Sequence, residues 1–208
     1  YDDIMIIYSA DHGEMLRAHG AWEKSSMYED SIRIPMIIKY PKMTGGRSVT
    51  TPVSLIDVFP TINEALGFGA QEQFEGESMV NLILNGDEAD RKPVFTESHA
   101  NGRITGTFAV RKGKWKLIHY EGYDPLLFDL ENDPQELKNL ADERKINPDI
   151  DTIISKLDSI LRNMLNTREV TEEAFFAQES LKQKISESGQ LEKELRKRGF
   201  SYDGKELY

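Results

Sequence analysis

An aspartate and a histidine stand next to each other at Asp11 and His12, directly after an apolar stretch of sequence. A carboxylate oxygen and an imidazole nitrogen are both ligands for divalent cations. Gly13 follows them and lets the backbone turn sharply, which two neighbouring side chains need if both are to reach one ion. The same three residues also suit an ordinary turn. The pair is therefore a candidate metal site whose interpretation depends on the residues around it.

Lys24 follows in a polar segment that we expect near the same edge of the fold. Its ammonium group could neutralise an anionic substrate, and the alternative is a solvated surface lysine. Glu29 and Arg33 are four residues apart, which is the spacing of an ion pair on one helix. The sequence contains no cysteine, which excludes disulfides, thiolate metal sites and a thiol nucleophile. Carboxylates, histidines, lysines, hydroxyls or a bound metal must therefore carry any chemistry.

Two apolar, β-prone runs predict the strands that would position these residues. Residues 3–9 lead straight to the Asp-His pair, and residues 36–40 follow a short helix predicted at 26–31. A strand, a crossover and a second strand predict a parallel sheet, in which ligands collect at the carboxyl ends of the strands. Residues 54–66 have helical apolar spacing, and Pro60 should kink or divide that helix.

From residue 91 onward the pattern changes to short strands, and the turn at 112–114 joins two of them as a hairpin. We expect an antiparallel sheet with strands at 94–96, 107–111, 115–118 and 126–129. Asn147 and Pro148 are the expected N-cap and first residue of a helix with an apolar stripe. Residues 172–198 are heavily charged and predict a peripheral last helix. The chain thus divides into units at 1–90, 91–147 and 148–208.

The charge balance narrows the classes of binding partner. There are 26 basic and 36 acidic side chains among 208 residues, a net charge of −10, so neither a nucleic acid nor an anionic membrane is an expected partner. No apolar run approaches the length of a membrane-spanning helix, and the first residues lack a signal-peptide pattern. Because the chain begins without Met inside a strand-like run, we expect a fragment, and its compartment stays open.

Three linked signatures resemble the sulfatase family of the alkaline phosphatase superfamily. That family has a strand ending in Asp-His-Gly or Asp-Asn-Gly, then Gly-x-x-x-Lys-x-x-x-Tyr-Glu, then Arg-x-Pro. The corresponding residues here are Asp11-His12-Gly13, Gly20, Lys24, Tyr28-Glu29 and Arg33-Ile34-Pro35. The resemblance extends over residues 3–165 and includes further segments at 53–61, 74–78, 110–118 and 127–134.

The resemblance implies an α/β fold: the C-terminal part of an alkaline-phosphatase-like, mostly parallel sheet flanked by helices, then a small antiparallel subdomain and C-terminal helices. It also implies that Asp11 and His12 bind one divalent cation, commonly calcium in this family. His12 stands where some members have asparagine, which leaves the metal identity open. Lys24 would hold a sulfate oxygen and stabilise charge in the transition state.

Two further histidines are candidate substrate-binding residues under this resemblance. His19 lies in the loop before Lys24 and is expected either to contact the sugar or aryl part of a substrate or to be merely solvated. His99, near Glu97 and Arg103, follows a strand of the second unit. In this family that unit borders the pocket and helps to select the substrate, so the resemblance makes His99 a candidate for substrate contact.

The nucleophile that the family requires is absent from this sequence. Sulfatases use a formylglycine made from the Cys or Ser of a Cys/Ser-x-Pro-x-Arg motif, and none of the eight prolines here lies in such a motif. Two acidic metal ligands of the family's first strand are absent too. We therefore expect the C-terminal portion of a sulfatase, inactive alone, with the formylglycine in the missing N-terminal part. Surfaces that this part would cover should favour self-association.

The expected substrate is a sulfated small molecule or a sulfated glycan, which the sequence does not name further. A phosphonate monoester hydrolase or phosphodiesterase of the same superfamily is an alternative, because Asp-His-Gly occurs there too. A third possibility is a non-catalytic binding module whose charged last helix contacts a partner. Lys24 ahead of Tyr28 favours the sulfatase or the closely similar phosphonate monoester hydrolase.

Overall fold

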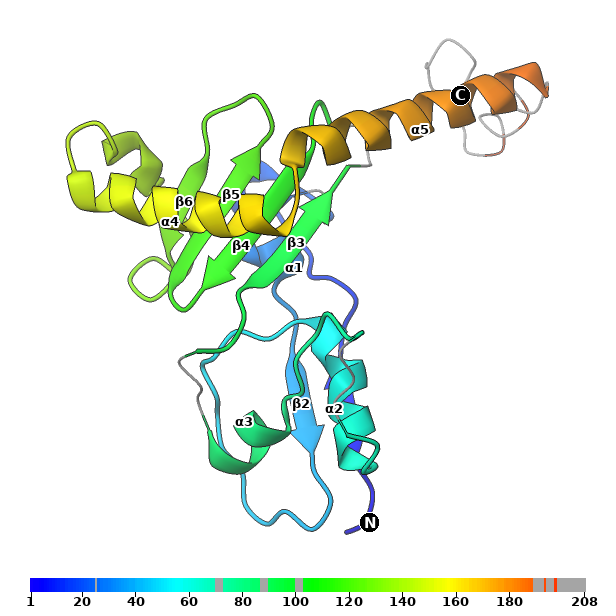
Figure 1. Cartoon of the computed structure of the whole chain (residues 1–208), viewed down its shortest axis with the longest axis vertical. Helices are drawn as coiled ribbons and strands as arrows, with labels where there is room; N and C mark the ends of the chain where they lie inside the picture. Colours follow the sequence, from blue (N-terminus) through cyan, green and yellow to red (C-terminus); the bar gives the residue numbers. More distant parts are fainter. Residues whose placement is uncertain are drawn as a thin grey trace.

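The computed structural model describes residues 1–24, 26–69, 73–86, 90–99 and 103–188, together with Lys193 and Lys197. Figure 1 shows a four-stranded sheet at one end of the molecule and a two-stranded sheet with short helices at the other. Helices packed beside both sheets confirm the predicted α/β class. No helix in the described ranges has the length and hydropathy that would let it cross a membrane.

β1 (Ile6–Ser9) and β2 (Met36–Lys39) form the smaller sheet and run antiparallel, in a register that places Ser9 opposite Met36. The parallel pairing that the sequence predicted for these two strands is wrong. The connection between them contains the one-turn helix α1 (Glu29–Ile32), and a backbone hydrogen bond of 2.7 Å ties this helix to the residues just after β1. Because the chain returns to the end of the sheet that it left, β2 starts beside the end of β1 and runs back along it.

Two helices lie beside the smaller sheet, α2 (Val58–Ala65) and α3 (Val80–Asn85). A short 3₁₀ helix, Leu55–Asp57, precedes α2. Pro60 lies in the first turn of α2, where backbone N–H groups have no intrahelical partner and a missing one costs little. The helical stretch changes from 3₁₀ to α helix between Asp57 and Val58, so Pro60 lies inside α2 and is not the point of division that the sequence predicted. The side chain of Arg91 holds the turn by pairing with the Asp57 carboxylate at 3.0 Å.

The larger sheet has the order β3-β4-β5-β6, and every neighbouring pair is antiparallel. Its strands are β3 (Val94–Ser98), β4 (Thr107–Lys112), β5 (Trp115–Tyr120) and β6 (Leu126–Asp129). The hairpin predicted between the middle two strands is confirmed, with Gly113 in the left-handed conformation at φ 58°. All four strands and their antiparallel pairing were expected from the short apolar runs.

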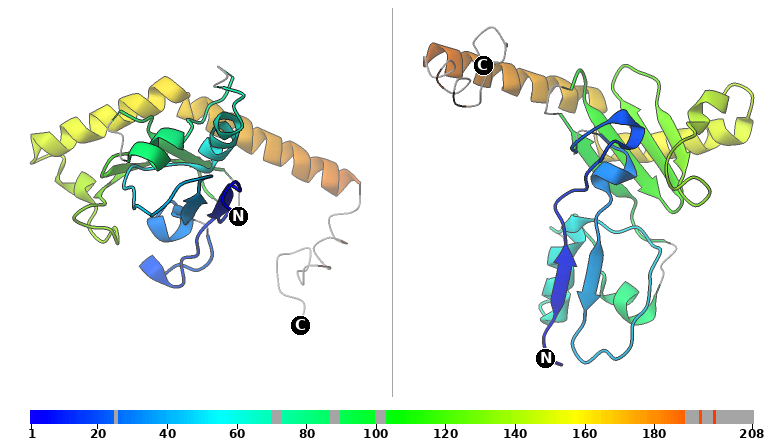
Figure 2. Two further views of the ribbon diagram at one scale, coloured as in Figure 1. Left: turned by 90° about the horizontal axis from the view of Figure 1, so that it is seen from below. Right: turned by 180° about the vertical axis from the view of Figure 1, so that it is seen from behind.

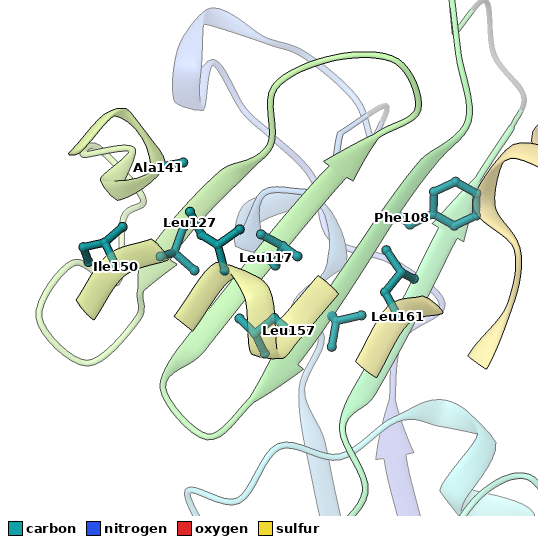
Figure 3. Packing of buried hydrophobic residues seen from close by; sticks show 9 residues of the cluster. Phe108, Leu117, Leu127, Ala141, Ile150, Leu157 and Leu161 are labelled. Atoms are coloured by element: carbon teal, nitrogen blue, oxygen red, sulfur yellow. The ribbon is translucent and has the colours of Figure 1, made fainter. Parts of the chain in front are cut away.

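Helix α4 (Pro148–Met164) crosses one face of this sheet and closes the main core (Figure 3). The Asn147 side chain accepts a hydrogen bond from the Asp149 amide, which confirms the predicted N-cap. Every third or fourth residue of α4 is apolar and meets alternate residues of the strands. The core cluster consists of Phe108, Val110, Leu117, Leu127, Ala141, Ile150, Ile154, Leu157 and Leu161.

Helix α5 (Thr167–Glu187) extends away from the sheet, as Figures 1 and 2 show, and most of its residues are exposed. The expected peripheral last helix is confirmed over these residues, and it begins five positions before residue 172 because Asn166 caps it. Most of the predicted helix after residue 188 lies outside the described residues. The division into units at residues 90 and 147 stays a prediction.

The opposite face of the larger sheet binds the segment around α1. Met27 is almost fully buried there against Ala109, Ile118 and Phe128. The ring of Tyr28 lies 5.9 Å from that of Phe128. Burying a methionine and part of an aromatic ring contributes on the order of 2–4 kcal/mol. This contact fixes the connection between β1 and β2 on the larger sheet.

A buried ion network accompanies the apolar contact. The ammonium group of Lys116 lies 2.9 Å from the Glu29 carboxylate and 2.8 Å from that of Glu136, and its side chain is only 1% exposed. Arg111 pairs with the second Glu29 oxygen at 3.1 Å. The Glu136 carboxylate also accepts a hydrogen bond from the Glu29 amide at the start of α1. Burial raises the pKa of Glu136, and the charge of Lys116 opposes this effect.

Replacing Lys116 with methionine should destabilise the intact protein strongly. The change leaves two carboxylates without their shared cation, and removing one partner of a buried ion pair costs about 3–5 kcal/mol. Equilibrium unfolding in denaturant measures the change in the free energy of unfolding. Lys114→Met is the matched control, because Lys114 pairs with Asp129 on the same sheet while partly exposed to solvent. Equal losses in the two variants would contradict a special role for the buried network.

Candidate anion and cation site at the end of strand β1

Asp11 and His12 follow β1 directly, at the point where the chain leaves the smaller sheet. The Nδ1 atom of His12 lies 2.7 Å from the carbonyl oxygen of Gly13. Because a carbonyl oxygen only accepts hydrogen bonds, Nδ1 must carry the proton, and neutral His12 then presents the lone pair of Nε2. A ring oriented by a backbone carbonyl with its other nitrogen free to coordinate is the usual arrangement of a metal-binding histidine.

Gly13 lets this turn pack against helix α1. Its amide donates to the carbonyl oxygen of Ser31 at 2.7 Å. A Cβ atom added to Gly13 would lie 2.1 Å from the carbonyl oxygen of Asp30, which is far inside van der Waals contact. Only glycine therefore permits the loop that carries His12 to lie against the backbone of α1.

The loop between His12 and Lys24 is closed by its own hydrogen bonds. The Glu14 carboxylate accepts from the Glu23 amide at 2.7 Å, and the Met15 amide donates to the Glu23 carbonyl at 2.8 Å. Met15 is buried, which anchors the loop in the fold. The hydroxyl of Ser31, in α1, donates to the carbonyl oxygen of Lys24 at 2.7 Å. These hydrogen bonds fold the loop back on itself, so that Lys24 lies next to His12.

The structure brings Asp11, His12 and Lys24 together, as the sequence predicted. Nζ of Lys24 lies 2.7 Å from Nε2 of His12, and Oδ2 of Asp11 lies 3.5 Å from the same nitrogen. The three side chains line one cavity of about 440 Å³, whose opposite wall includes strand β3. A carboxylate, an imidazole lone pair and an ammonium group thus converge on one space.

The donor chemistry of Asp11 and His12 fits a divalent cation. Their two donor atoms are close enough to reach one ion, and a carboxylate oxygen with a neutral imidazole suits calcium, zinc or manganese to different degrees. Within the described residues, no group of three or more His, Cys, Asp or Glu side chains is placed to hold a metal. The two residues alone would leave most of a coordination sphere to be filled by other ligands.

The family described as N-sulphoglucosamine sulphohydrolase, C-terminal, matches residues 17–166 and therefore most of the chain. The chain belongs to the sulfatase family. The match begins inside the loop that carries Lys24 and ends beyond α4, so it includes the larger sheet and the helix that covers it. The sulfatase resemblance read from the three signatures is confirmed.

Curated relatives of this sulfatase chain are longer proteins. Arylsulfatase K of Mus musculus is 33% identical over 177 residues, which make up 80% of this chain and 31% of the relative. Choline-sulfatase of Rhizobium meliloti (strain 1021) is 40% identical over 145 residues, 68% of this chain and 28% of the relative. The chain thus spans about a third of the length of these relatives.

Solved structures agree with the sulfatase assignment. A protein in complex with its substrate D-glucosamine-2-N,6-O-disulfate is 25% identical, with a TM-score of 0.59 over 78% of this chain and 35% of that one. The phosphonate monoester hydrolase of Agrobacterium radiobacter is 27% identical, with a TM-score of 0.65 over 79% of this chain and 36% of that one. The chain therefore has the fold of the C-terminal part of this superfamily.

His19, in the loop between His12 and Lys24, stacks on the ring of Tyr28. Its imidazole is parallel to the ring of Tyr28 within 5°, with the ring centres 3.8 Å apart. His19 is exposed and is not among the described residues that line the cavity of Asp11, His12 and Lys24. The stacking gives this histidine a structural partner, and its contact with a substrate stays a prediction.

His99 lies on the far side of the larger sheet. Side chains alternate between the two faces of a strand, and Glu97 is opposite Phe108, whose side chain belongs to the core under α4. His99 also packs against Phe108, with ring centres 5.2 Å apart, and its side chain is 15% exposed. His99 is not among the described residues that line the cavity. The structure thus does not bring His99 together with Lys24, and its role in substrate binding stays a prediction.

The sequence named Arg103 only as a neighbour of His99, yet Arg103 lies in the cavity wall. Its guanidinium Nε donates to the Ser98 hydroxyl at 2.8 Å. Ser98 is opposite Thr107 in the sheet, on the face that Ala109 presents to the site. Because side chains alternate along a strand, the sequence could have placed Ser98 on the opposite face of the sheet from Glu97 and His99. It could not predict that Arg103 bonds to Ser98.

Replacing Gly13 with alanine should displace the His12 loop and lower the stability of the intact protein. The new methyl group overlaps a backbone oxygen that has little freedom to move, and overpacking of this kind costs about 1–3 kcal/mol. Thermal and denaturant unfolding measure the loss. Gly46→Ala is the control, because a Cβ atom there meets nothing within 4 Å and Gly46 has no positive φ. Equal stability of the two variants would show that the close approach at Gly13 is not required.

Proposed function

We propose that this chain supplies part of the active site of a sulfatase that hydrolyses sulfate esters with the help of a divalent cation. The single observation that carries the proposal is the convergence of Asp11, His12 and Lys24 on one cavity. A sulfate ester is a tetrahedral anion, and its recognition needs positive charge at its oxygens. The ammonium group of Lys24 and a cation held by Asp11 and His12 would together supply that charge.

Asp11 and His12 are the residues that would hold the cation. The ion, calcium in this proposal, supplies positive charge that polarises the sulfate group when bound. The hydrogen bond from His12 Nδ1 to Gly13 keeps Nε2 as the donor atom, so the histidine is ready to coordinate without a change of tautomer. The remaining ligands belong, in this proposal, to a part of the protein outside this chain.

Lys24 binds a sulfate oxygen in this proposal. The hydrogen bond that it donates to His12 Nε2 supports this role, because it brings the ammonium group next to a residue that would hold the cation. With a cation on His12, the ammonium group turns to the substrate, because two positive charges repel each other and both attract the anion. Its charge stabilises the negative charge that develops on the sulfate oxygens as the ester bond breaks.

The nucleophile is proposed to be a formylglycine in the preceding part of the full-length protein, which makes this chain inactive alone. The smaller sheet carries surfaces that such a part would cover. Several large apolar side chains of β1, β2 and α2 are more than half exposed: Tyr8, Ile37 and Phe59. Apolar groups gathered on two strands and one helix mark a surface that other protein covers. Self-association of the isolated chain through this surface is a prediction of the same argument.

A phosphonate monoester hydrolase is the second candidate function. The observation in its favour is the similarity to the enzyme of Agrobacterium radiobacter, with 27% identity and a TM-score of 0.65. Phosphonate monoesters and sulfate monoesters are both tetrahedral monoanions, and a lysine with a cation serves both. The relative rates on matched aryl sulfate and aryl phenylphosphonate substrates distinguish the two functions.

Replacing Lys24 with glutamine in the intact protein should lower the turnover of 4-nitrophenyl sulfate roughly 10²–10³-fold, because one preorganised charge at the transition state is lost. Release of nitrophenolate measures the rate. Lys182→Gln, an exposed change on α5, should leave it unaltered. Faster hydrolysis of the phenylphosphonate than of the sulfate would support the second candidate. An unchanged rate in the Lys24 variant would contradict the proposed role.

Asp11→Asn should weaken calcium binding by the intact protein at least tenfold, because a neutral amide replaces the charged oxygen ligand. Isothermal titration with calcium chloride after chelation measures the affinity directly. Asp151→Asn, on the exposed first turn of α4, is the matched control. Tight calcium binding by both variants would mean that Asp11 is not a ligand. Tighter binding of zinc than of calcium by the unaltered protein would correct the metal.

A further inference from the structure

Arg103 adds a second positive group to the cavity that contains Lys24. Its Nε donates to Ser98 Oγ at 2.8 Å, and its Nη1 donates to Thr107 Oγ1 at 3.3 Å. These hydroxyls belong to neighbouring strands, β3 and β4, so the guanidinium is held at the end of the larger sheet. Both partners are neutral. The sheet thus positions the side chain, and neither of these two partners compensates its charge.

Burial makes this charge costly. Burial lowers the pKa of Arg103, and the nearby phenol of Tyr120 opposes the effect. Within the described part of the chain, no carboxylate lies at ion-pair distance from the guanidinium, whereas Arg111, Lys114 and Lys116 of the same sheet each have one. A partly desolvated cation with only hydroxyl partners gains most from an anion that enters the cavity.

Glu97 of strand β3 also lines the cavity. It is opposite Phe108 in the sheet, and its carboxylate lies 3.5 Å from Nε2 of His99 and forms no ion pair with Arg103. Asp11 is on the other wall of the cavity, where it lies beside His12. Lys24 and Arg103 therefore present two separate positive groups to one space, one on the loop after β1 and one on the larger sheet.

We propose that Arg103 is a specificity-determining residue that binds a second oxyanion of the substrate, a carboxylate or a further sulfate, while the ester sulfate lies at Lys24. The planar guanidinium has N–H donors in a fork that fits two oxygens of such a group. The hydrogen bonds to Ser98 and Thr107 fix the plane of the guanidinium and so the direction of its remaining donors. The inference deepens the proposed function, on which it rests, by naming the substrate class: sulfate esters of acidic compounds.

Binding of stable sulfonates tests this inference separately from turnover. Sulfonates imitate the sulfate group and are not hydrolysed, so the measurement does not depend on the nucleophile. Isothermal titration of the intact protein compares benzenesulfonate with 3-sulfobenzoate and 1,3-benzenedisulfonate. We expect at least one of the two dianions to bind about tenfold more tightly than benzenesulfonate, because one added charge-assisted hydrogen bond contributes about that much to the affinity. The preferred dianion identifies the second group as carboxylate or sulfonate.

The variants decide whether Arg103 causes the preference. Arg103→Gln should remove it and leave the affinity for benzenesulfonate within about twofold, whereas Arg103→Lys should keep part of it. Arg162→Gln, which breaks the exposed pair with Asp158 on α4, should keep all of it. Equal affinities in the unaltered protein, or an equal loss for all three probes in Arg103→Gln, would overturn the inference. Failure of the proposed function appears instead as absent turnover of sulfate esters.

Discussion

The candidate site depends on a buried ion network that lies outside the cavity. Lys116 of β5 is enclosed by the carboxylates of Glu29 and Glu136, and it is separated from Glu29 by 87 residues of sequence. Glu29 starts the helix that follows Lys24, so the network fixes the loop on the larger sheet. Charges buried in this way need every partner, because each unpaired one has lost its hydration. The network therefore holds the start of α1, and with it the loop, against the larger sheet.

This arrangement separates two tasks within one sequence signature. Lys24 faces the cavity and contacts His12, whereas Tyr28 stacks on His19 and lies against the larger sheet, and Glu29 enters the ion network. In the proposed function the lysine binds the sulfate group, and the tyrosine and glutamate hold the lysine loop in place. Their short separation in sequence reflects the length of loop needed to pass from the cavity to the sheet.

The two faces of the larger sheet have different roles. The face under α4 is closed by apolar side chains and gives the domain its core (Figure 3). The other face receives Met27 and the ion network, and at its end Ser98 and Thr107 hold Arg103 beside the cavity. One sheet thus supplies stability on one side and the wall of the site on the other. The smaller sheet has exposed apolar side chains, and our proposal is that other protein covers them.

The sequence by itself determined the local elements and the family. Short apolar runs predicted the four strands of the larger sheet, and Asn147 and Pro148 predicted the start of α4. The resemblance to the sulfatase signatures predicted that Asp11, His12 and Lys24 share a site. Only the tertiary structure decided the antiparallel pairing of β1 with β2, the face on which His99 lies, and the entry of Arg103 into the cavity wall. Local patterns depend on neighbours within a few residues, whereas strand direction and the facing of a side chain depend on hydrogen bonds and packing between segments far apart in the chain.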